Sequence, residues 1–368
     1  KLAKQALALA EESGDAVALR DAWFARWWGT LGPDHLDERL EVVRALGELG
    51  QRTNDLRTQL LSIECAIGAN IMRGDRVAVE QNLAQFEDLA TQLRQPGFIF
   101  MGMNYRSSWL INQGRFLEAE ARVEEAFEYG NGVVPFAETV CQGQLYWSRS
   151  VRGAEVDEMP KGSELQHLLR FTLIEDATRT ILGTMLRYSA DRDLDVAYEA
   201  VKSVDYKSID RDEHWLIAMA GLTDVAVSAG DTEMTKWLYE ALAPYADLIA
   251  IHDLIFLGRG SVGFSVALLA VGLQDLDAAA GHFERAIEVE ESAGMRLALV
   301  LSRVGLAGTL GRRGAPGDTE RAQALFDRAC DESSHLGLGD ANPVVRLLER
   351  ERPETVFYSD TWRRIQAS

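Results

Sequence analysis

The sequence has 368 residues, of which 47% are hydrophobic and 26% are charged, and its formal net charge is −19. A protein that grips nucleic acid by its phosphates needs clustered Lys and Arg side chains, so this charge argues against direct nucleic-acid contact by the chain. The length allows two ordinary domains or one long solenoid, in which each repeat packs only on its neighbours.

Cysteine usage and hydropathy indicate a protein of the reducing cytoplasm. Cys65, Cys141 and Cys330 lie far apart and form no CxxC motif, whereas disulfide frameworks and zinc sites have characteristic cysteine patterns. No apolar run reaches the length of a membrane span, and no signal peptide is recognisable. The chain begins at Lys1 within sequence typical of a helix, so we expect it to be a piece of a longer protein.

The first residues alternate amphipathic helices with short turns. Residues 1–12 and 16–30 predict two helices, and between them Gly14 ends one helix and Asp15 caps the next. The second helix carries four aromatic residues, Trp23, Phe24, Trp27 and Trp28. Residues four apart share a helix face, so Trp23 pairs with Trp27, and Phe24 with Trp28. We expect one pair in the core, whereas the other packs there, on a preceding repeat, or along a groove.

A triplet of small, large and small residues recurs along the chain. In the segment from Gly263 to Gly337, Ala279, Phe283 and Ala286 follow steps of four and three, and the same pattern returns 43 residues later. Such steps place three side chains on one face of a helix. The positions that begin comparable triplets are Val79, Ala119, Ala197, Thr235, Ala279 and Ala322. A fixed period of this kind predicts a helical repeat.

The spacing of the triplets predicts one more repeat than the side chains reveal. Most successive positions lie 38 to 44 residues apart, but 119 and 197 are separated by 78. Half of that gap points to a unit near Glu158, over a weak helical stretch broken by Pro160 and Gly162. A degenerate repeat is therefore expected there.

The triplets resemble those of the tetratricopeptide repeat (TPR), whose second helix carries small and large residues at the same steps. The family's period is about 34 residues, so the longer spacing here implies a long-helix version. The resemblance implies an all-α, right-handed TPR-like superhelical solenoid of about eight antiparallel helix pairs over residues 1–340. Residues 341–368 are expected to form a terminal helix and a linker, or the truncated start of a following module.

Four segments, 25–43, 214–246, 263–288 and 313–337, resemble the repeat region that follows the nucleotide-binding domain in large actinobacterial signalling ATPases. Such regions occur in large LuxR-type ATP-binding transcriptional regulators and in cyclase–ATPase fusions. The resemblance implies a non-catalytic sensor or protein-interaction domain, with a small-molecule inducer or a protein partner on its concave face, and no membrane contact. The alternative is a purely architectural scaffold for oligomerisation or partner docking, without a small ligand.

Several short motifs have structural explanations. Gly258, Gly260 and Gly263 match GxGxxG, but a dinucleotide site needs a βαβ unit and a suitably placed acidic residue. We expect instead a glycine-rich start of a repeat helix, where backbones approach closely. The tripeptide at 73–75, Arg-Gly-Asp, reads as a helix stop followed by a helix cap.

The remaining polar residues form no recognisable catalytic constellation. The GxxxxGK[ST], HExxH and GxSxG motifs are absent, and the six histidines are dispersed. His252-Asp253 is an adjacent imidazole–carboxylate pair in a connector, for which a structural role is expected. The pairs Glu124-Glu125 and Glu290-Glu291 are expected on solvated helix faces. The sequence thus predicts no enzyme, no cofactor and no metal site.

The repeat geometry suggests where a ligand would bind. In tetratricopeptide arrays the concave groove is lined by first helices, at positions about fifteen and eleven residues before the small residue of the second helix. Counting back along this chain selects a polar and aromatic set in the middle of the array, with an acidic residue on each side. The candidate contacts are Glu64, Asn104, Ser108, Trp147 and Asp224.

Overall fold

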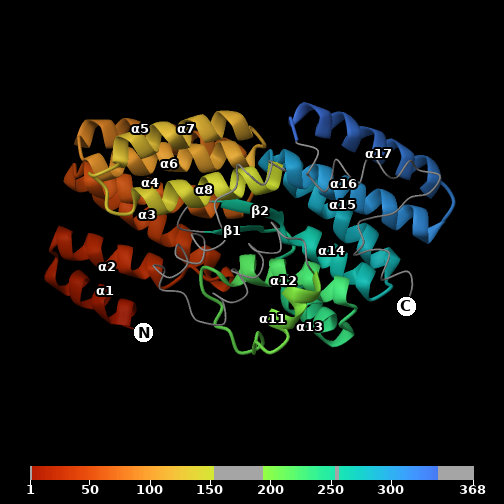
Figure 1. Ribbon diagram of the computed structural model, residues 1–368. Helices are drawn as coiled ribbons and strands as arrows, with labels where there is room; N and C mark the ends of the chain where they lie inside the picture. Colours follow the sequence, from red (N-terminus) through yellow and green to blue (C-terminus); the bar gives the residue numbers. More distant parts are fainter. Residues whose placement is uncertain (1, 153–193, 253–256, 339–368) are drawn as a thin grey trace.

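The computed structural model describes residues 2–152, 194–252 and 257–338, and within them fifteen α-helices and one two-stranded sheet (Figure 1). The helices of the first half are α1 (Leu2–Ser13), α2 (Ala16–Trp28), α3 (Leu36–Thr53), α4 (Leu56–Met72), α5 (Arg76–Leu93), α6 (Pro96–Asn112), α7 (Phe116–Gly130) and α8 (Ala137–Arg152). Those of the second half are α11 (Leu194–Val201), α12 (Trp215–Ala229), α13 (Thr232–Leu242), α14 (Val262–Gly272), α15 (Leu276–Ala293), α16 (Arg296–Arg313) and α17 (Asp318–His335). The strands are β1 (Ile249–His252) and β2 (Leu257–Ser261), and short 3-10 helices cover Pro33–His35 and Ala243–Tyr245.

Consecutive helices pack on one another as hairpins. The pairs α2–α3, α4–α5, α6–α7, α12–α13, α14–α15 and α16–α17 correspond to the repeats expected from the sequence. The prediction of an all-α helical solenoid is therefore confirmed. The repeat expected near Glu158 and the segment 341–368 lie outside the described residues. Among the described helices, none combines the length and hydropathy that crossing a membrane requires.

Glycine and aspartate set the corners between helices, as the sequence indicates. Gly74 has φ of +69°, a conformation that other residues rarely adopt, and it ends α4. Asp75 then caps α5, because its Oδ1 accepts a hydrogen bond from the backbone N–H of Ala78 at 3.0 Å. The tripeptide at 73–75 is thus a helix turn. Asp15, Asp231 and Asp275 cap α2, α13 and α15 in the same way.

The repeated triplets form the core between helix pairs. Ala279, Phe283 and Ala286 are all fully buried. In the following repeat Phe326 is only half-buried, although Ala322 and Ala329 are buried beside it. Small residues on either side of a large one let neighbouring helices approach closely. This packing explains why the triplet recurs from repeat to repeat.

Only part of the aromatic cluster on α2 belongs to the core. Trp27 is buried, and Trp23 and Phe24 pack partly buried on the same hydrophobic cluster. Trp28 keeps 47% of its surface exposed and contacts Phe24 edge to face, with 6.1 Å between ring centroids. The first pair predicted from the sequence thus packs inward, and Trp28 faces outward.

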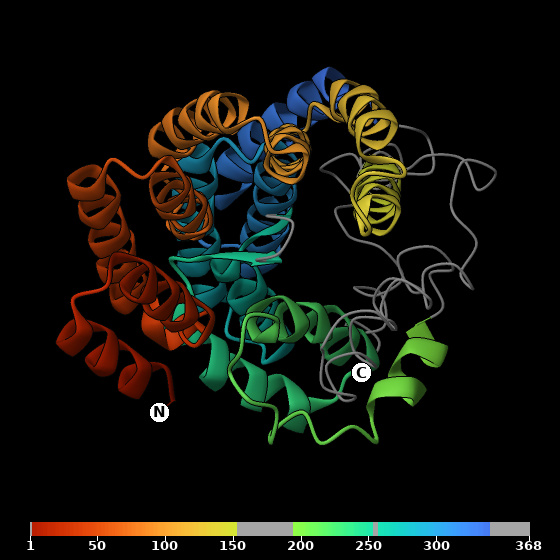
Figure 2. The ribbon, with the colours of Figure 1, turned by 90° about the vertical axis from the view of Figure 1, so that its left-hand side faces the viewer.

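The solenoid also makes contacts between distant parts of the chain. In Figure 2 the helices α1–α8 follow an arc, α11–α13 lie on the opposite side, and the strands lie between them. Asp34 pairs with Arg211 and accepts a hydrogen bond from the hydroxyl of Tyr245. A side chain at Gly32 would collide with the backbone carbonyl of Arg211. At a second contact, the turn at Gly74 packs on the end of α15.

The unequal burial of equivalent phenylalanines gives a test of the repeat core. Phe283→Ala leaves a cavity among fully packed neighbours, so we expect it to lower the free energy of unfolding by about 3–5 kcal/mol. Phe326→Ala removes a half-buried ring, and we expect a cost of about 1–2 kcal/mol. Urea unfolding followed by circular dichroism measures both. Equal costs would contradict the packing described here.

Candidate interaction site

A β-hairpin lies against the inner helices of the solenoid, a feature that the sequence does not predict. β1 and β2 pair antiparallel, with Ile249 opposite Ser261 and His252 opposite Leu257. Residues 249–251 are at most 1% exposed. The strands contact α4, α6, α12, α14, α15 and α16. The hairpin therefore occupies space between the two halves of the chain, where the sequence predicts the concave groove.

The glycine-rich motif permits this placement. Gly260 has φ of +117°, and a Cβ there would lie 2.9 Å from the Cβ of Ala298. At Gly263 a Cβ would lie 2.9 Å from the carbonyl oxygen of Ala246. The motif thus serves close backbone approach and leads into α14 after Ser261, as the sequence predicts. The strands β1 and β2 pair antiparallel, whereas the βαβ unit of a dinucleotide site has parallel strands.

Three polar contacts tie β2 to three different helices. The backbone N–H of Gly258 donates to Asn112 Oδ1 of α6 at 2.8 Å. Arg259 forms an ion pair with Asp224 of α12. The backbone N–H of Ser261 donates to Glu290 Oε1 of α15 at 3.1 Å. The hairpin is therefore anchored on both sides of the solenoid.

Two of the predicted groove residues meet at a buried polar cluster between α6 and α8. Gln144 of α8 donates through Nε2 to the backbone carbonyl of Asn104 at 2.9 Å and to Ser108 Oγ at 2.6 Å. Asn104 Nδ2 lies 4.0 Å from Cys141 Sγ. Asn104, Ser108 and Gln144 are each at most 1% exposed. We call Asn104, Ser108, Cys141 and Gln144 the α6–α8 cluster.

The α6–α8 cluster contains two amide oxygens without hydrogen bonds. Asn104 Oδ1 and Gln144 Oε1 are buried, and neither has a partner within the part of the chain that the structure describes. A buried acceptor left unpaired costs about 1–3 kcal/mol. The repeat spacing does not single out Gln144, although this residue stands three positions before Trp147 and so belongs to a neighbouring part of the same helix face. The cluster offers two acceptors to a hydrogen-bond donor.

The other predicted contacts lie apart from this cluster and are engaged within the chain. Trp147 is half-buried and packs on the hydrophobic cluster that includes Leu257 of β2. Glu64 accepts a hydrogen bond from the hydroxyl of Tyr105 at 2.5 Å, and burial raises the pKa of Glu64. Asp224 pairs with Arg259 of the hairpin. The structure thus joins Asn104 and Ser108 through Gln144 and engages the remaining three in other contacts.

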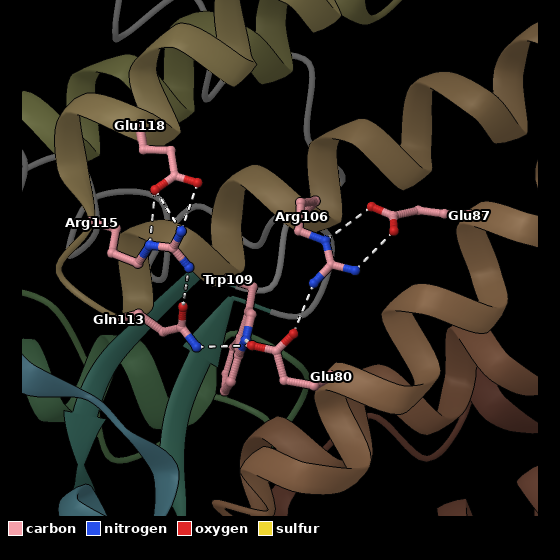
Figure 3. A network of polar contacts seen from close by, with 7 residues as sticks. All are labelled: Glu80, Glu87, Arg106, Trp109, Gln113, Arg115 and Glu118. Atoms are coloured by element: carbon pink, nitrogen blue, oxygen red, sulfur yellow. Dashed lines mark hydrogen bonds and ion pairs between the residues drawn. The ribbon is translucent and has the colours of Figure 1, made fainter.

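A second polar network joins two helix pairs on the α5–α6 side (Figure 3). Glu80 of α5 accepts hydrogen bonds from Trp109 Nε1 at 2.6 Å, Gln113 Nε2 at 3.0 Å and Arg106 Nη1 at 2.9 Å. Arg106 also forms a two-pronged contact with Glu87, at 2.9 and 2.8 Å. Burial opposes ionisation of Glu80, but these donors outweigh it and lower its pKa. The network fixes α6 against the preceding pair.

Comparisons with known proteins identify no family. No protein-family model matches the chain, and no curated protein matches its sequence. Among solved structures, it is similar to a Rap protein complexed with competence and sporulation factor. That likeness has 15% sequence identity and a TM-score of 0.39, and it covers 90% of this chain and 81% of the other.

Glu290 gives the hairpin a pH-dependent anchor. The prediction that Glu290 lies on a solvated helix face is wrong, because the side chain is 1% exposed. Burial raises its pKa from 4.5 to about 8. An acid whose pKa is raised by folding stabilises the protein less as pH rises. We therefore expect the free energy of unfolding to fall between pH 4.5 and pH 8, by an amount on the order of 4 kcal/mol. Glu290→Gln, which mimics the protonated acid, should remove this decline in urea unfolding at pH 5, 6.5 and 8.

The neighbouring Glu291 provides a matched control for that experiment. Its side chain is 52% exposed and pairs with Arg303. Glu291→Gln should keep the pH dependence of the wild type. If the Glu290→Gln protein loses stability with rising pH as steeply as the wild type, folding does not raise the pKa of Glu290.

The network around Glu80 generates a separate prediction. Glu80→Gln leaves three donors short of a charged acceptor, so we expect a loss of about 1–2 kcal/mol at pH 7. A lowered pKa contributes stability above the ordinary value of 4.5, so the loss should shrink as pH falls below it. Glu125→Gln removes an exposed ion pair with Arg122, outside this network, and should cost less than about 0.5 kcal/mol. Equal effects of the two variants in urea unfolding would contradict the conclusion that Glu80 fixes α6 against α5.

Proposed function

We propose that this chain is a non-catalytic interaction domain of a multidomain signalling ATPase, in which a peptide segment of a partner binds at the α6–α8 cluster. The observation that carries the proposal is the pair of buried amide oxygens on Asn104 and Gln144. An extended peptide supplies backbone N–H groups, which are donors suited to such acceptors. The resemblance of the repeats to those of large LuxR-type transcriptional regulators supports a regulatory setting.

The oxygens are covered in the arrangement described here, which couples binding to a change of shape. Asn104 is 1% exposed and Gln144 is fully buried, so a partner reaches them only when α8 shifts relative to α6. The unpaired acceptors destabilise the closed arrangement by about 1–3 kcal/mol each. A partner that supplies donors relieves this cost in the shifted arrangement alone. Such a difference in affinity is what moves an equilibrium between two curvatures of the solenoid.

The polar residues of α6 extend this coupling toward the hairpin. Asn104, Ser108 and Asn112 are spaced four residues apart and therefore share one face of the helix. The first two belong to the α6–α8 cluster, and Asn112 holds Gly258 of β2. A shift of α8 against this face thus changes the surroundings of the hairpin as well. In the full-length protein we propose that this movement reaches the ATPase and output domains.

An architectural role without a small ligand is the second candidate. It is favoured by apolar side chains on α1 and α2 that lie largely in solvent: Leu2, Leu9, Val17 and Trp28, between 47% and 81% exposed. Large apolar side chains exposed on neighbouring helices are typical of contacts between proteins. In this version the helical repeats hold copies of the chain, or a partner, at a fixed spacing.

Peptide binding can be tested with a phage-displayed library of random dodecamers selected on the purified chain. Isothermal titration of the selected synthetic peptide should show binding to wild type and about tenfold weaker binding to Asn104→Leu and Gln144→Leu, since about 1.4 kcal/mol corresponds to a factor of ten. Asn70→Leu is the matched control, because Asn70 donates to Asn82 on the α4–α5 pair at 2.9 Å. This variant should bind like wild type.

Two results would contradict the peptide proposal. One is selection that yields no binder; the other is a peptide whose affinity is unchanged by both cluster variants. If no peptide binds, and the chain sediments as a dimer that Leu9→Glu converts to a monomer, the architectural function replaces it. Circular dichroism of each variant separates lost binding from lost folding.

A further inference from the structure

A second group of polar side chains lies at the start of α12, away from the α6–α8 cluster. The side chain of His214 is 2% exposed, and neither ring nitrogen has a hydrogen-bond partner among the described residues. A neutral imidazole carries one N–H donor and one acceptor nitrogen. Leaving both unpaired away from water is energetically unfavourable. His214 therefore lacks the partners that a purely structural histidine has.

A second imidazole lies beside it. His252, the last residue of β1, contacts His214 edge to face, with 4.9 Å between ring centroids and 80° between ring planes. Its Nδ1 is likewise buried and unpaired among the described residues. The two histidines are 38 residues apart in sequence, so the fold itself brings together two nitrogen donors with spare bonding capacity.

Two carboxylates complete the group. Glu213 Oε1 lies 3.6 Å from His214 Nδ1, too far for a good hydrogen bond. Asp212 Oδ1 accepts the backbone N–H of His214 at 2.9 Å, which holds this aspartate close to the histidine. One donor atom from each of Asp212, Glu213 and His214 lies within 4.8 Å of the others. A cation about 2.0–2.2 Å from each ligand would need only small side-chain rotations to bridge them.

We propose that Asp212, Glu213 and His214 bind a divalent transition-metal ion, with the His252 ring packed against His214. Imidazole with carboxylate suits Zn²⁺, Co²⁺ or Ni²⁺, whereas Mg²⁺ and Ca²⁺ prefer ligand sets made of oxygen. The ion would satisfy one ring nitrogen of His214, which the protein leaves unpaired. It would also fix the imidazole at the start of α12 on which His252 of β1 packs, and so fasten the hairpin to the second half of the solenoid.

Titration of the metal-free chain tests this site. Isothermal titration with Zn²⁺ should show one ion per chain, and Co²⁺ should give the visible absorption bands of a nitrogen- and oxygen-coordinated ion. Both ions should raise the thermal unfolding temperature, because a ligand that binds the folded state stabilises it. Mg²⁺ at the same concentration should change neither the heat signal nor the unfolding temperature.

Variants then assign the ligands. His214→Gln and His252→Gln should each weaken Zn²⁺ binding at least about tenfold. His282→Gln is the control, since His282 is partnered by the hydroxyl of Tyr239 at 3.2 Å, and it should bind like wild type. If His214→Gln misfolds, the double variant Asp212→Asn, Glu213→Gln makes the same test from the exposed side of the group.

The proposal is overturned if wild type binds no Zn²⁺ at micromolar concentration. It is also overturned if binding survives unchanged in His214→Gln and in the double variant, because the ion then lies elsewhere on the acidic surface. Neither result depends on whether a peptide binds the α6–α8 cluster.

Discussion

The β1–β2 hairpin exists only because helices cover it. An isolated pair of short strands is at best marginally stable in water, and here the strands have four and five residues. Their stability comes from burial of Ile249, Ala250 and Ile251 and from side chains on three helices that bond β2. Those helices lie in both halves of the chain. The hairpin therefore turns an array of nearest-neighbour contacts into one body.

This arrangement changes how the solenoid responds to forces. In a simple repeat array, each pair packs on its neighbours and stability spreads along one dimension. Here Asp34 meets Arg211 and Tyr245, 177 and 211 residues further along the sequence, and the turn at Gly74 meets α15. A shift of one helix pair must therefore be accommodated by distant contacts. Such linkage is what a sensor needs, because local binding then changes the shape of the whole.

The local elements could be predicted from the sequence, and the hairpin could not. Phe283 and its small neighbours mark a helix face through spacing alone, and Gly74 with Asp75 marks a corner through backbone conformation and capping. These signals act within a few residues. The strands instead depend on Asn112 and Glu290, which are distant in sequence from the residues they hold. The five residues of β2 include two glycines and show no periodicity that would predict such a contact.

The candidate site shows the same division. Counting along the repeats led to Asn104 and Ser108, because the period fixes which face of a first helix points inward. It did not lead to Gln144, whose role depends on how α8 meets α6, nor to the His214–His252 contact, which depends on the hairpin.

These two groups of side chains differ in what they do to the chain. The α6–α8 cluster holds unpaired acceptors in a closed helix contact, so under the proposed function a bound donor would favour its opening. The histidine pair holds unpaired nitrogens where β1 meets α12, so a bound cation favours closure there. Asn112 connects the first group to β2, and β2 pairs with β1, which ends at the second. A partner at one end and an ion at the other would therefore act on the same hairpin, and reciprocity requires that any effect of one on the affinity for the other be returned in equal measure.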